Sequence, residues 1–367
     1  MNKKNLITVL LCGVFILALS AWCFFGPKET YSDSERRALA KFPEITWETI
    51  SSGRFATDFE KYATDAFPLR DIWRSVKAYT RLGVFFQKDN NDLFVKDGHI
   101  GKLEYPMRPY MMDYAADLFT DIRNTNFPDA NVYFAMIPDK NMYLADLKLD
   151  YDEFETQMNE KLPFATPIHI SELLSAEDYY YTDTHWRQEK ITDVADRLAQ
   201  AMGTELPKDY TQKKLDVDFY GVYAGQSALN PEPDSITVLY NETIKGLKVQ
   251  LFDEMTGNWK ASHLYSQSKA ESRDPYELVL SGNQTMVKIT NPANTDGKRL
   301  IVFRDSFGSS IAPLLAQGYS EVILLDLRYA SSTSLKTPQL RAMINFNHAD
   351  VLFMYSTLLL NNSTGMS

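Results

Sequence analysis

The chain has 367 residues, with 38 basic and 48 acidic side chains and a formal net charge of −10. Such an acidic composition argues against nucleic acid or another polyanion as the main partner. The two cysteines, Cys12 and Cys23, both lie in the first apolar segment, so the rest of the chain can form neither a disulfide nor a thiolate metal site.

The N-terminal segment predicts a membrane anchor. Lys3 and Lys4 precede residues 6–25, which carry no charge and are long enough to cross a bilayer with the N-terminus in the cytoplasm. A cleaved signal peptide has a shorter apolar segment followed by small residues. Residues 18–20 fit such a site, but the apolar run continues past them. We therefore expect residues 1–26 to form an uncleaved signal anchor, with the remainder extracellular or periplasmic.

Residues 27–90 are predicted to form a juxtamembrane linker followed by a helical element. Residues 26–43 are polar and rich in charge, which is typical of a linker. Between residues 53 and 74 aromatic side chains recur at helical spacing, and Phe67-Pro68 breaks or ends the pattern. An aromatic stripe of this kind indicates core contacts rather than a ligand site.

Residues 91–360 are predicted to form one α/β domain. Apolar strands are expected at 92–95, 131–137, 300–303, 321–325 and 349–355, and helices at 110–124, 187–202, 308–316 and 340–346. Uninterrupted apolar strands that alternate with helices are typical of a parallel sheet covered on both faces, which is a three-layer arrangement. Residues 210–280 are less regular, and we interpret the polar stretch 262–275 as an excursion or loop.

Two short segments hold the groups of a nucleophilic site. Ser306 follows the strand 300–303, so it lies at the carboxyl edge of the sheet, where such folds bind ligands. His185 can remove the hydroxyl proton, and Asp183 can orient the imidazole if this segment is extended. Each signal alone has a plainer explanation, since two polar residues on one loop are common and Asp305-Ser306 can simply cap the next helix. Together they predict a catalytic Ser306–His185–Asp183 triad.

An acyl-transfer site also needs hydrogen-bond donors for the oxyanion of its tetrahedral intermediate. Backbone amides at the start of the helix after Ser306 are one source, because they carry partial positive charge. Gly282 and Asn283 are the second candidates, although the same pair is explained by a plain β-turn. The chain lacks the Gly-x-Ser-x-Gly, Gly-x-x-x-x-Gly-Lys and His-Glu-x-x-His motifs. We expect no metal and no cofactor.

The motifs resemble those of SGNH hydrolase-like polysaccharide O-acetyltransferases, in particular alginate O-acetyltransferase proteins J and X and the DHHW family. The segments that carry the resemblance are Asp183-Thr184-His185-Trp186, Asp305-Ser306-Phe307 and residues 35–43, 65–71 and 326–329. The DHHW name implies a histidine where this chain has Thr184, a position outside the presumed triad. In these families the Asp-x-His motif precedes the serine, as it does here.

The resemblance implies that Ser306 is the acetylated nucleophile, with His185 as base and Asp183 as its orienter. It further implies that an MBOAT-type membrane acyltransferase supplies acetyl groups, which the enzyme places on hydroxyls of a cell-wall or secreted polysaccharide. An aromatic face can pack on a sugar ring, but such residues can equally be core or salt-bridge residues. The substrate-binding candidates are Trp186, Arg328 and Tyr329.

Two other functions stay open at this stage. A carbohydrate acetylesterase of the same fold uses the same triad and differs only in that water accepts the acyl group. An anchored glycan-binding scaffold with a vestigial site is the non-enzymatic alternative. The predicted anchor favours transfer, and the complete set of Asp183, His185 and Ser306 argues against a scaffold.

Overall fold

The computed structural model describes residues 3–295, 297–330 and 339–366. Within these residues the chain divides into two compact units. The smaller consists of Met1–Leu93 with Val222–Pro231, and the larger of Phe94–Gly221 with Glu232–Ser367.

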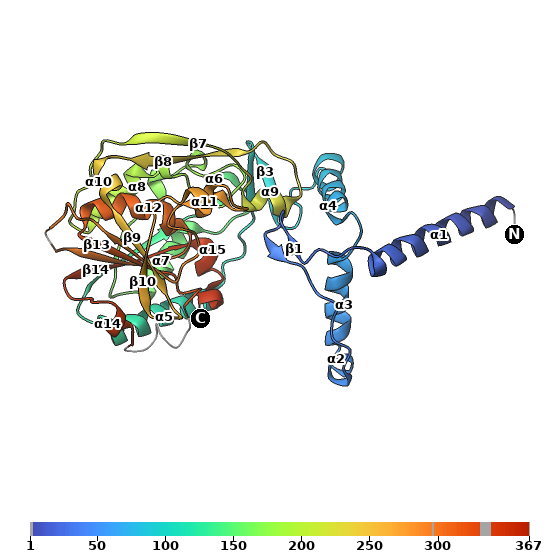
Figure 1. Cartoon of the computed structure of the whole chain (residues 1–367), viewed down its shortest axis with the longest axis horizontal. Coiled ribbons are helices and arrows are strands. Elements are labelled where there is room, and N and C mark those ends of the chain that lie inside the picture. Colours follow the sequence, from blue (N-terminus) through green and yellow to red (C-terminus); the bar gives the residue numbers. More distant parts are fainter. Residues whose placement is uncertain (1–2, 296, 331–338, 367) are drawn as a thin grey trace. The chain divides into compact units, whose positions relative to one another are not determined.

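The larger unit is built around an eight-stranded sheet with the order β10-β9-β11-β13-β12-β14-β5-β6 (Figure 1). The strands from β13 to β6 run parallel, whereas β11, β9 and β10 extend the sheet through antiparallel pairs. In chain order the strands are β5 (Asn131–Ile137), β6 (Thr166–Pro167), β9 (Lys248–Asp253), β10 (Asn258–Ser262), β11 (Met286–Thr290), β12 (Arg299–Arg304), β13 (Glu321–Leu325) and β14 (Ala349–Ser356).

Helices cover both faces of this sheet. Along β12, Leu300 and Val302 enter one core, whereas Ile301 and Phe303 enter the other, because successive side chains of a strand point to opposite faces. Each fully buried side chain of this kind contributes about 1.5–3 kcal/mol. The first core includes α8 (Thr192–Ala201) and α12 (Phe307–Leu315), and the second includes α5 (Pro109–Asn126), α7 (Tyr151–Lys161) and α14 (Gln339–Met343). The predicted three-layer α/β architecture is confirmed.

The region 210–280 is more regular than predicted. β7 (Thr211–Phe219) and β8 (Asp234–Tyr240) form an antiparallel ribbon, and β9 with β10 forms a hairpin at the end of the main sheet. On β7 only Phe219 is buried, so the strand shows no apolar alternation in the sequence. The interpretation of this region as irregular is therefore wrong for these strands. The stretch 262–275 contains the short helix α11 (Gln267–Ala270).

Short elements complete the larger unit. β3 (Leu93–Lys96), which begins at the boundary between the units, pairs with β4 (His99–Lys102). The short helices are α6 (Asn141–Leu144), α10 (Glu242–Gly246) and α15 (Thr357–Leu360).

The smaller unit begins with α1 (Lys3–Phe25), the one helix among the described residues that is long and apolar enough to cross a membrane. The predicted break at Phe67-Pro68 is confirmed, because α3 ends at Asp65 and α4 begins at Arg70. The elements of this unit are α1, β1 (Tyr31–Ser32), β2 (Arg37–Ala38), α2 (Trp47–Ser51), α3 (Arg54–Asp65), α4 (Arg70–Tyr79), a π-helical turn (Thr80–Val84) and α9 (Val222–Ser227).

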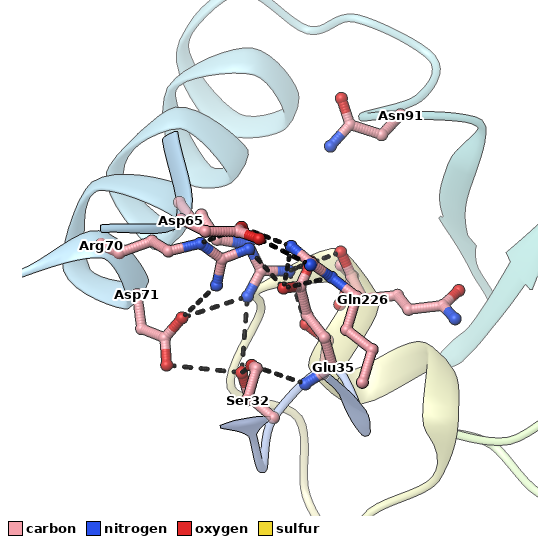
Figure 2. A network of polar contacts seen from close by, with 12 residues as sticks. Ser32, Glu35, Asp65, Arg70, Asp71, Asn91 and Gln226 are labelled. Carbon is pink, nitrogen blue, oxygen red and sulfur yellow. Dashed lines mark hydrogen bonds and ion pairs between the residues drawn. The ribbon is translucent and has the colours of Figure 1, made fainter. Parts of the chain in front are cut away.

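A network of ion pairs holds the smaller unit together (Figure 2). Arg70 pairs with Glu35 and lies 3.4 Å from Asp65. Arg74 lies 3.3 Å from Glu35 and donates to the carbonyl of Gly225 at 2.9 Å. The network thus joins β1–β2, α3, α4 and α9 through largely buried charges.

Candidate active site

His185 connects Asp183 to Ser306. Its Nδ1 lies 2.5 Å from Asp183 Oδ2, and its Nε2 lies 2.7 Å from Ser306 Oγ. Asp183 is only 1% exposed, and the His185 side chain is 13% exposed. The structure therefore brings the three predicted residues together, in the order Ser306, His185 and Asp183, at hydrogen-bond distances.

Ser306 lies between β12 and α12 at the carboxyl edge of the parallel strands. It occupies the N-cap position of α12, but its side chain makes no capping hydrogen bond. Asp305 makes that bond instead, accepting from the Phe307 N–H at 3.1 Å through Oδ1. Its Oδ2 accepts from the Ser356 N–H at 2.8 Å, which ties β12 to the end of β14. The capping role thus falls to Asp305, and the Ser306 hydroxyl faces His185.

The backbone at the start of α12 retains one amide for an oxyanion. The N–H of Phe307 is donated to the Asp305 side chain, and the N–H of Gly308 is donated to the Asp305 carbonyl at 3.1 Å. Among the described residues the Ser306 N–H has no hydrogen-bond acceptor. Of the three backbone amides at the start of α12, it is therefore the one that is available to an oxyanion.

Gly282 and Asn283 lie in a turn with positive φ at Leu280, Ser281 and Gly282. The Gly282 N–H is donated to the Val279 carbonyl at 3.4 Å. No contact within the described part of the chain joins this turn to Ser306, so the structure favours the plain-turn interpretation for Gly282. The role of Asn283 stays a prediction.

Tyr276 is a site residue that the sequence did not reveal. Its ring stacks on the His185 imidazole with 3.9 Å between centroids and 11° between planes. Its hydroxyl donates to the Ser306 carbonyl at 3.2 Å and lies 3.2 Å from Ser310 Oγ. Burial raises the pKa of Tyr276 well above its usual value, so the phenol stays a donor.

Two buried side chains of opposite charge hold the loop that precedes His185. Lys140 Nζ donates to the carbonyls of Tyr180 at 2.8 Å and Tyr181 at 3.1 Å. The Asp234 carboxylate accepts from the amides of Tyr181 at 2.9 Å and Thr182 at 2.7 Å. Burial lowers the pKa of Lys140 to about 8. Charge-assisted bonds are stronger than neutral ones, so this clamp sets where the loop places the triad.

Gly221 packs directly against the backbone and side chain of Asp183. A Cβ atom at Gly221 would lie 2.2 Å from the Cβ of Asp183, which no side chain can accommodate without displacing that carboxylate. The Gly221 N–H also donates to Thr182 Oγ1 at 2.8 Å. Only glycine lets these two segments approach so closely.

The site is bordered by two further buried carboxyl groups, those of Asp139 and Glu104. Asp139 accepts from Thr184 Oγ1 at 3.4 Å, and Glu104 accepts from Thr357 Oγ1 at 2.9 Å. Burial raises the pKa of Asp139 to about 6, and burial together with the nearby Asp139 charge raises that of Glu104 to about 8. Asp139 and Lys140 follow β5 at the same edge at which Ser306 follows β12. The carboxyl-edge rule that identified Ser306 would therefore have found them too.

The structure overturns the prediction that Trp186 contacts substrate. Trp186 is 0% exposed, and its indole N–H lies 3.0 Å from the Phe307 carbonyl and 2.8 Å from Ser310 Oγ. The segment is extended, since Trp186 forms a β-bridge with Tyr179, so neighbouring side chains point in opposite directions. With His185 directed at Ser306, Trp186 enters the core and positions α12.

For Arg328 the structure supports the salt-bridge alternative. Its Nε and Nη2 donate to Asp326 at 2.9 and 2.7 Å, so the guanidinium is already engaged. Tyr329 is 42% exposed and stays a candidate for substrate contact. Within the described residues, no three His, Cys, Asp or Glu side chains gather as metal ligands would.

The sheet, its helix layers and the serine at the carboxyl edge define a three-layer α/β fold with a mainly parallel sheet. A DHHW family protein from Eubacterium siraeum shares it with a TM-score of 0.60 and 20% identity, over 76% of this chain and 95% of that chain. Bacillus cereus PatB1 matches with a TM-score of 0.58 and 18% identity, over 74% and 97% of the two chains. PatB1 with a sulfonyl adduct gives 0.57 and 19%, over 73% and 95%.

The O-acetyltransferase domain of Pseudomonas putida AlgJ is a more distant match, with a TM-score of 0.42 and 12% identity over 74% of this chain and 93% of that chain. No protein-family model and no curated protein matches the chain. The predicted resemblance to the DHHW family is thus confirmed at the level of the fold.

Proposed function

We propose that this protein is an extracytoplasmic O-acetyltransferase that moves acetyl groups through a serine acyl-enzyme onto hydroxyls of a cell-wall or secreted polysaccharide. The observation that carries the proposal is the continuous relay from Asp183 through His185 to Ser306, with distances of 2.5 and 2.7 Å. The identity of the transferred group, acetyl, and the class of acceptor, a polysaccharide, are inferred from the motifs that resemble those of polysaccharide O-acetyltransferases.

In the first half-reaction His185 Nε2 takes the proton of Ser306 as Oγ attacks the carbonyl carbon of an acetyl donor. Asp183 holds the other imidazole nitrogen and stabilises the imidazolium. The Ser306 N–H lies beside the new oxyanion, and a donor of this kind typically contributes on the order of 3 kcal/mol. The intermediate then collapses, the bond to the donor's leaving group breaks, and His185 returns the proton to that group.

In the second half-reaction the acceptor takes the place of the leaving group. His185 removes the proton of a sugar hydroxyl, whose oxygen attacks the acetyl-Ser306 carbonyl. Collapse releases the acetylated sugar, and the proton returns to Ser306 Oγ. The same steps with water as acceptor would make the protein an acetylesterase, so the choice of acceptor separates the two activities.

We also propose that α1 is retained as a single-pass anchor and that an MBOAT-type membrane acyltransferase supplies the acetyl groups. The most apolar window of α1 has a mean hydropathy of 2.5, and none of that window is buried. Attachment to the membrane would keep the triad near a donor that emerges from the bilayer.

The test is intact-mass spectrometry of the full chain in detergent after incubation with 4-nitrophenyl acetate. We expect one added acetyl group on the wild type and none on Ser306→Ala, together with a loss of turnover of roughly ten-thousand-fold or more. Ser309→Ala is the matched control, because Ser309 is a buried neighbour on α12 outside the triad. Acetylation of Ser306→Ala to the wild-type level would refute the assignment.

Added oligosaccharide then distinguishes the acceptors. Transfer of the acetyl group to sugar supports the transferase, whereas release as acetate at an unchanged rate supports the esterase. If the wild-type protein forms no adduct and hydrolyses no ester, the result would instead favour a non-enzymatic glycan-binding scaffold.

A further inference from the structure

Helix α4 has its apolar face outward. Ile72, Trp73, Val76 and Tyr79 are 57, 49, 49 and 52% exposed. They lie within one face of the helix, because positions 72, 76 and 79 follow helical spacing and 73 adjoins them. A helix that packs on a globular core normally shows the reverse arrangement.

The inward face of α4 is charged. The side chains of Arg70 and Arg74 are 13 and 18% exposed, and those of Glu35 and Asp65, with which they pair, are 16 and 6% exposed (Figure 2). Rotating α4 to bury its apolar face would separate these ion pairs, and breaking a buried pair costs several-fold more than a surface pair. The ion-pair network therefore fixes the outward direction of the apolar residues.

The apolar surface continues beyond α4. Val84, Phe85 and Phe86 are 64, 66 and 82% exposed. We refer to these three residues together with Ile72, Trp73, Val76 and Tyr79 as the α4 apolar face. A concentration of exposed apolar residues of this kind is typical of a surface that contacts a membrane or another protein.

We propose that the α4 apolar face lies in the headgroup region of a lipid bilayer. The inference rests on the proposal that α1 stays as a membrane anchor. α1 ends at Phe25, α4 begins at Arg70, and both belong to the same compact unit, so the anchor keeps α4 near a membrane surface. Trp, Tyr and Phe are the side chains that favour the interface between lipid and water.

Charge separates this surface from the rest of the chain. Residues 26–93 contain eleven basic and eleven acidic side chains, so their net charge is zero. Residues 94–367 carry 25 basic and 37 acidic side chains, a net charge of −12. An anionic lipid surface therefore repels the larger unit but not the smaller one. Lipid thus fits the α4 apolar face better than it fits the remainder of the protein.

The experiment measures the depth of spin labels in nanodiscs of phosphatidylcholine and phosphatidylglycerol. The full chain carries Cys12→Ser and Cys23→Ser, and one nitroxide is placed by Val76→Cys, by Lys77→Cys on the same helix, or by Met255→Cys at a site that is 97% exposed. Power saturation compares collisions with oxygen and with a water-soluble nickel chelate. We expect collisions at position 76 to shift toward oxygen, with positions 77 and 255 favouring the nickel chelate.

Equal exposure of positions 76 and 255 to the nickel chelate would overturn the proposal. Protection of position 76 from both reagents, with dipolar broadening between labels, would assign the face to a second copy of the chain. Protection in native membranes but not in nanodiscs would assign it to a protein partner.

Two controls separate this inference from the proposals on which it depends. A label on native Cys12 in a Cys23→Ser chain reports whether α1 itself is in the bilayer. Trp73→Glu with Val76→Glu is expected to move a label at Tyr79→Cys out of the bilayer while acetylation of Ser306 by 4-nitrophenyl acetate is unchanged. Loss of that acetylation in the double variant would show damage to the fold rather than release from lipid.

Discussion

The imidazole of His185 lies flat on the phenol ring of Tyr276, with 3.9 Å between centroids and 11° between planes. The same tyrosine donates its hydroxyl to the Ser306 carbonyl. Tyr276 therefore contacts the proposed base with its ring and the backbone of the proposed nucleophile with its hydroxyl. An aromatic face also stabilises the cationic imidazolium that forms when the base takes a proton.

The ring of Tyr276 is expected to matter more than its hydroxyl. Tyr276→Phe keeps the stack and loses a neutral hydrogen bond, so stability should fall by about 0.5–1.5 kcal/mol and the acetylation rate by less than about tenfold. Tyr276→Ala removes the support of the imidazole, and misplacement of a catalytic group by about 1 Å costs roughly a hundredfold. Single-turnover acetylation of both variants checks this order, and equal rates for them would show that the stack has no role.

Removal of the Lys140 side chain is expected to destabilise the fold strongly, because this side chain holds the loop that precedes His185. Lys140→Met leaves the carbonyls of Tyr180 and Tyr181 without their charged donor and Asp234 without its nearby cation. We expect the free energy of unfolding to fall by about 3–5 kcal/mol. Lys96→Met is the control, because Lys96 and Asp146 form an exposed pair that is worth about 0–1 kcal/mol. Urea unfolding measures both, and a similar loss in the two variants would contradict the clamp.

Gly221→Ala is expected to reduce activity while leaving the chain folded. The new methyl group would overlap the Cβ and Cα atoms of Asp183 and the carbonyl oxygen of Thr182, so this segment must shift and the imidazole loses its orientation. We expect a fall of about a hundredfold in the acetylation rate. Gly246→Ala is the matched control, because a Cβ there has no atom within 4 Å. Circular dichroism verifies the fold of both variants, and full activity of Gly221→Ala would contradict the predicted displacement.

The triad could be predicted from the sequence because each of its parts follows a local rule. Ser306 comes directly after an uninterrupted apolar strand, and Asp183 lies two residues before His185 on an extended segment. The parallel strands β12, β13 and β14 have the same local signature. The pairing of His185 with Ser306, 121 residues apart, is the one long-range inference, and it follows because the two segments together hold the groups of a nucleophilic site.

Tyr276 and Asp234 could not be predicted because tertiary approach alone brings them to the site. Tyr276 lies in a short 3-10 turn whose sequence has no catalytic pattern. Asp234 is the first residue of β8, and the partner strand β7 is too polar to be recognised as a strand from its sequence. Lys140 follows β5 as Ser306 follows β12, so the edge rule applied evenly would have found it. The prediction for Trp186 is wrong because, although an aromatic face can pack on a sugar ring, alternation along an extended segment sends this side chain into the core.

Glu104 is expected to make the larger unit less stable as pH rises. Burial raises its pKa in the folded chain to about 8 from an ordinary value of 4.5, so the folded state holds this proton more tightly than the unfolded state. The stability is fully present below about pH 4.5 and is lost as pH rises toward about 8, at up to about 1.4 kcal/mol per pH unit.

Glu104→Gln removes this dependence, because the amide stays neutral and its oxygen can still accept from Thr357. Urea unfolding should find wild type and variant similar at pH 5 and the variant more stable by a few kcal/mol at pH 8. Glu254→Gln is the control, since Glu254 is an exposed carboxyl. A Glu104→Gln chain that loses stability with pH as steeply as the wild type would show that another group, with Asp139 the first to examine, carries the dependence.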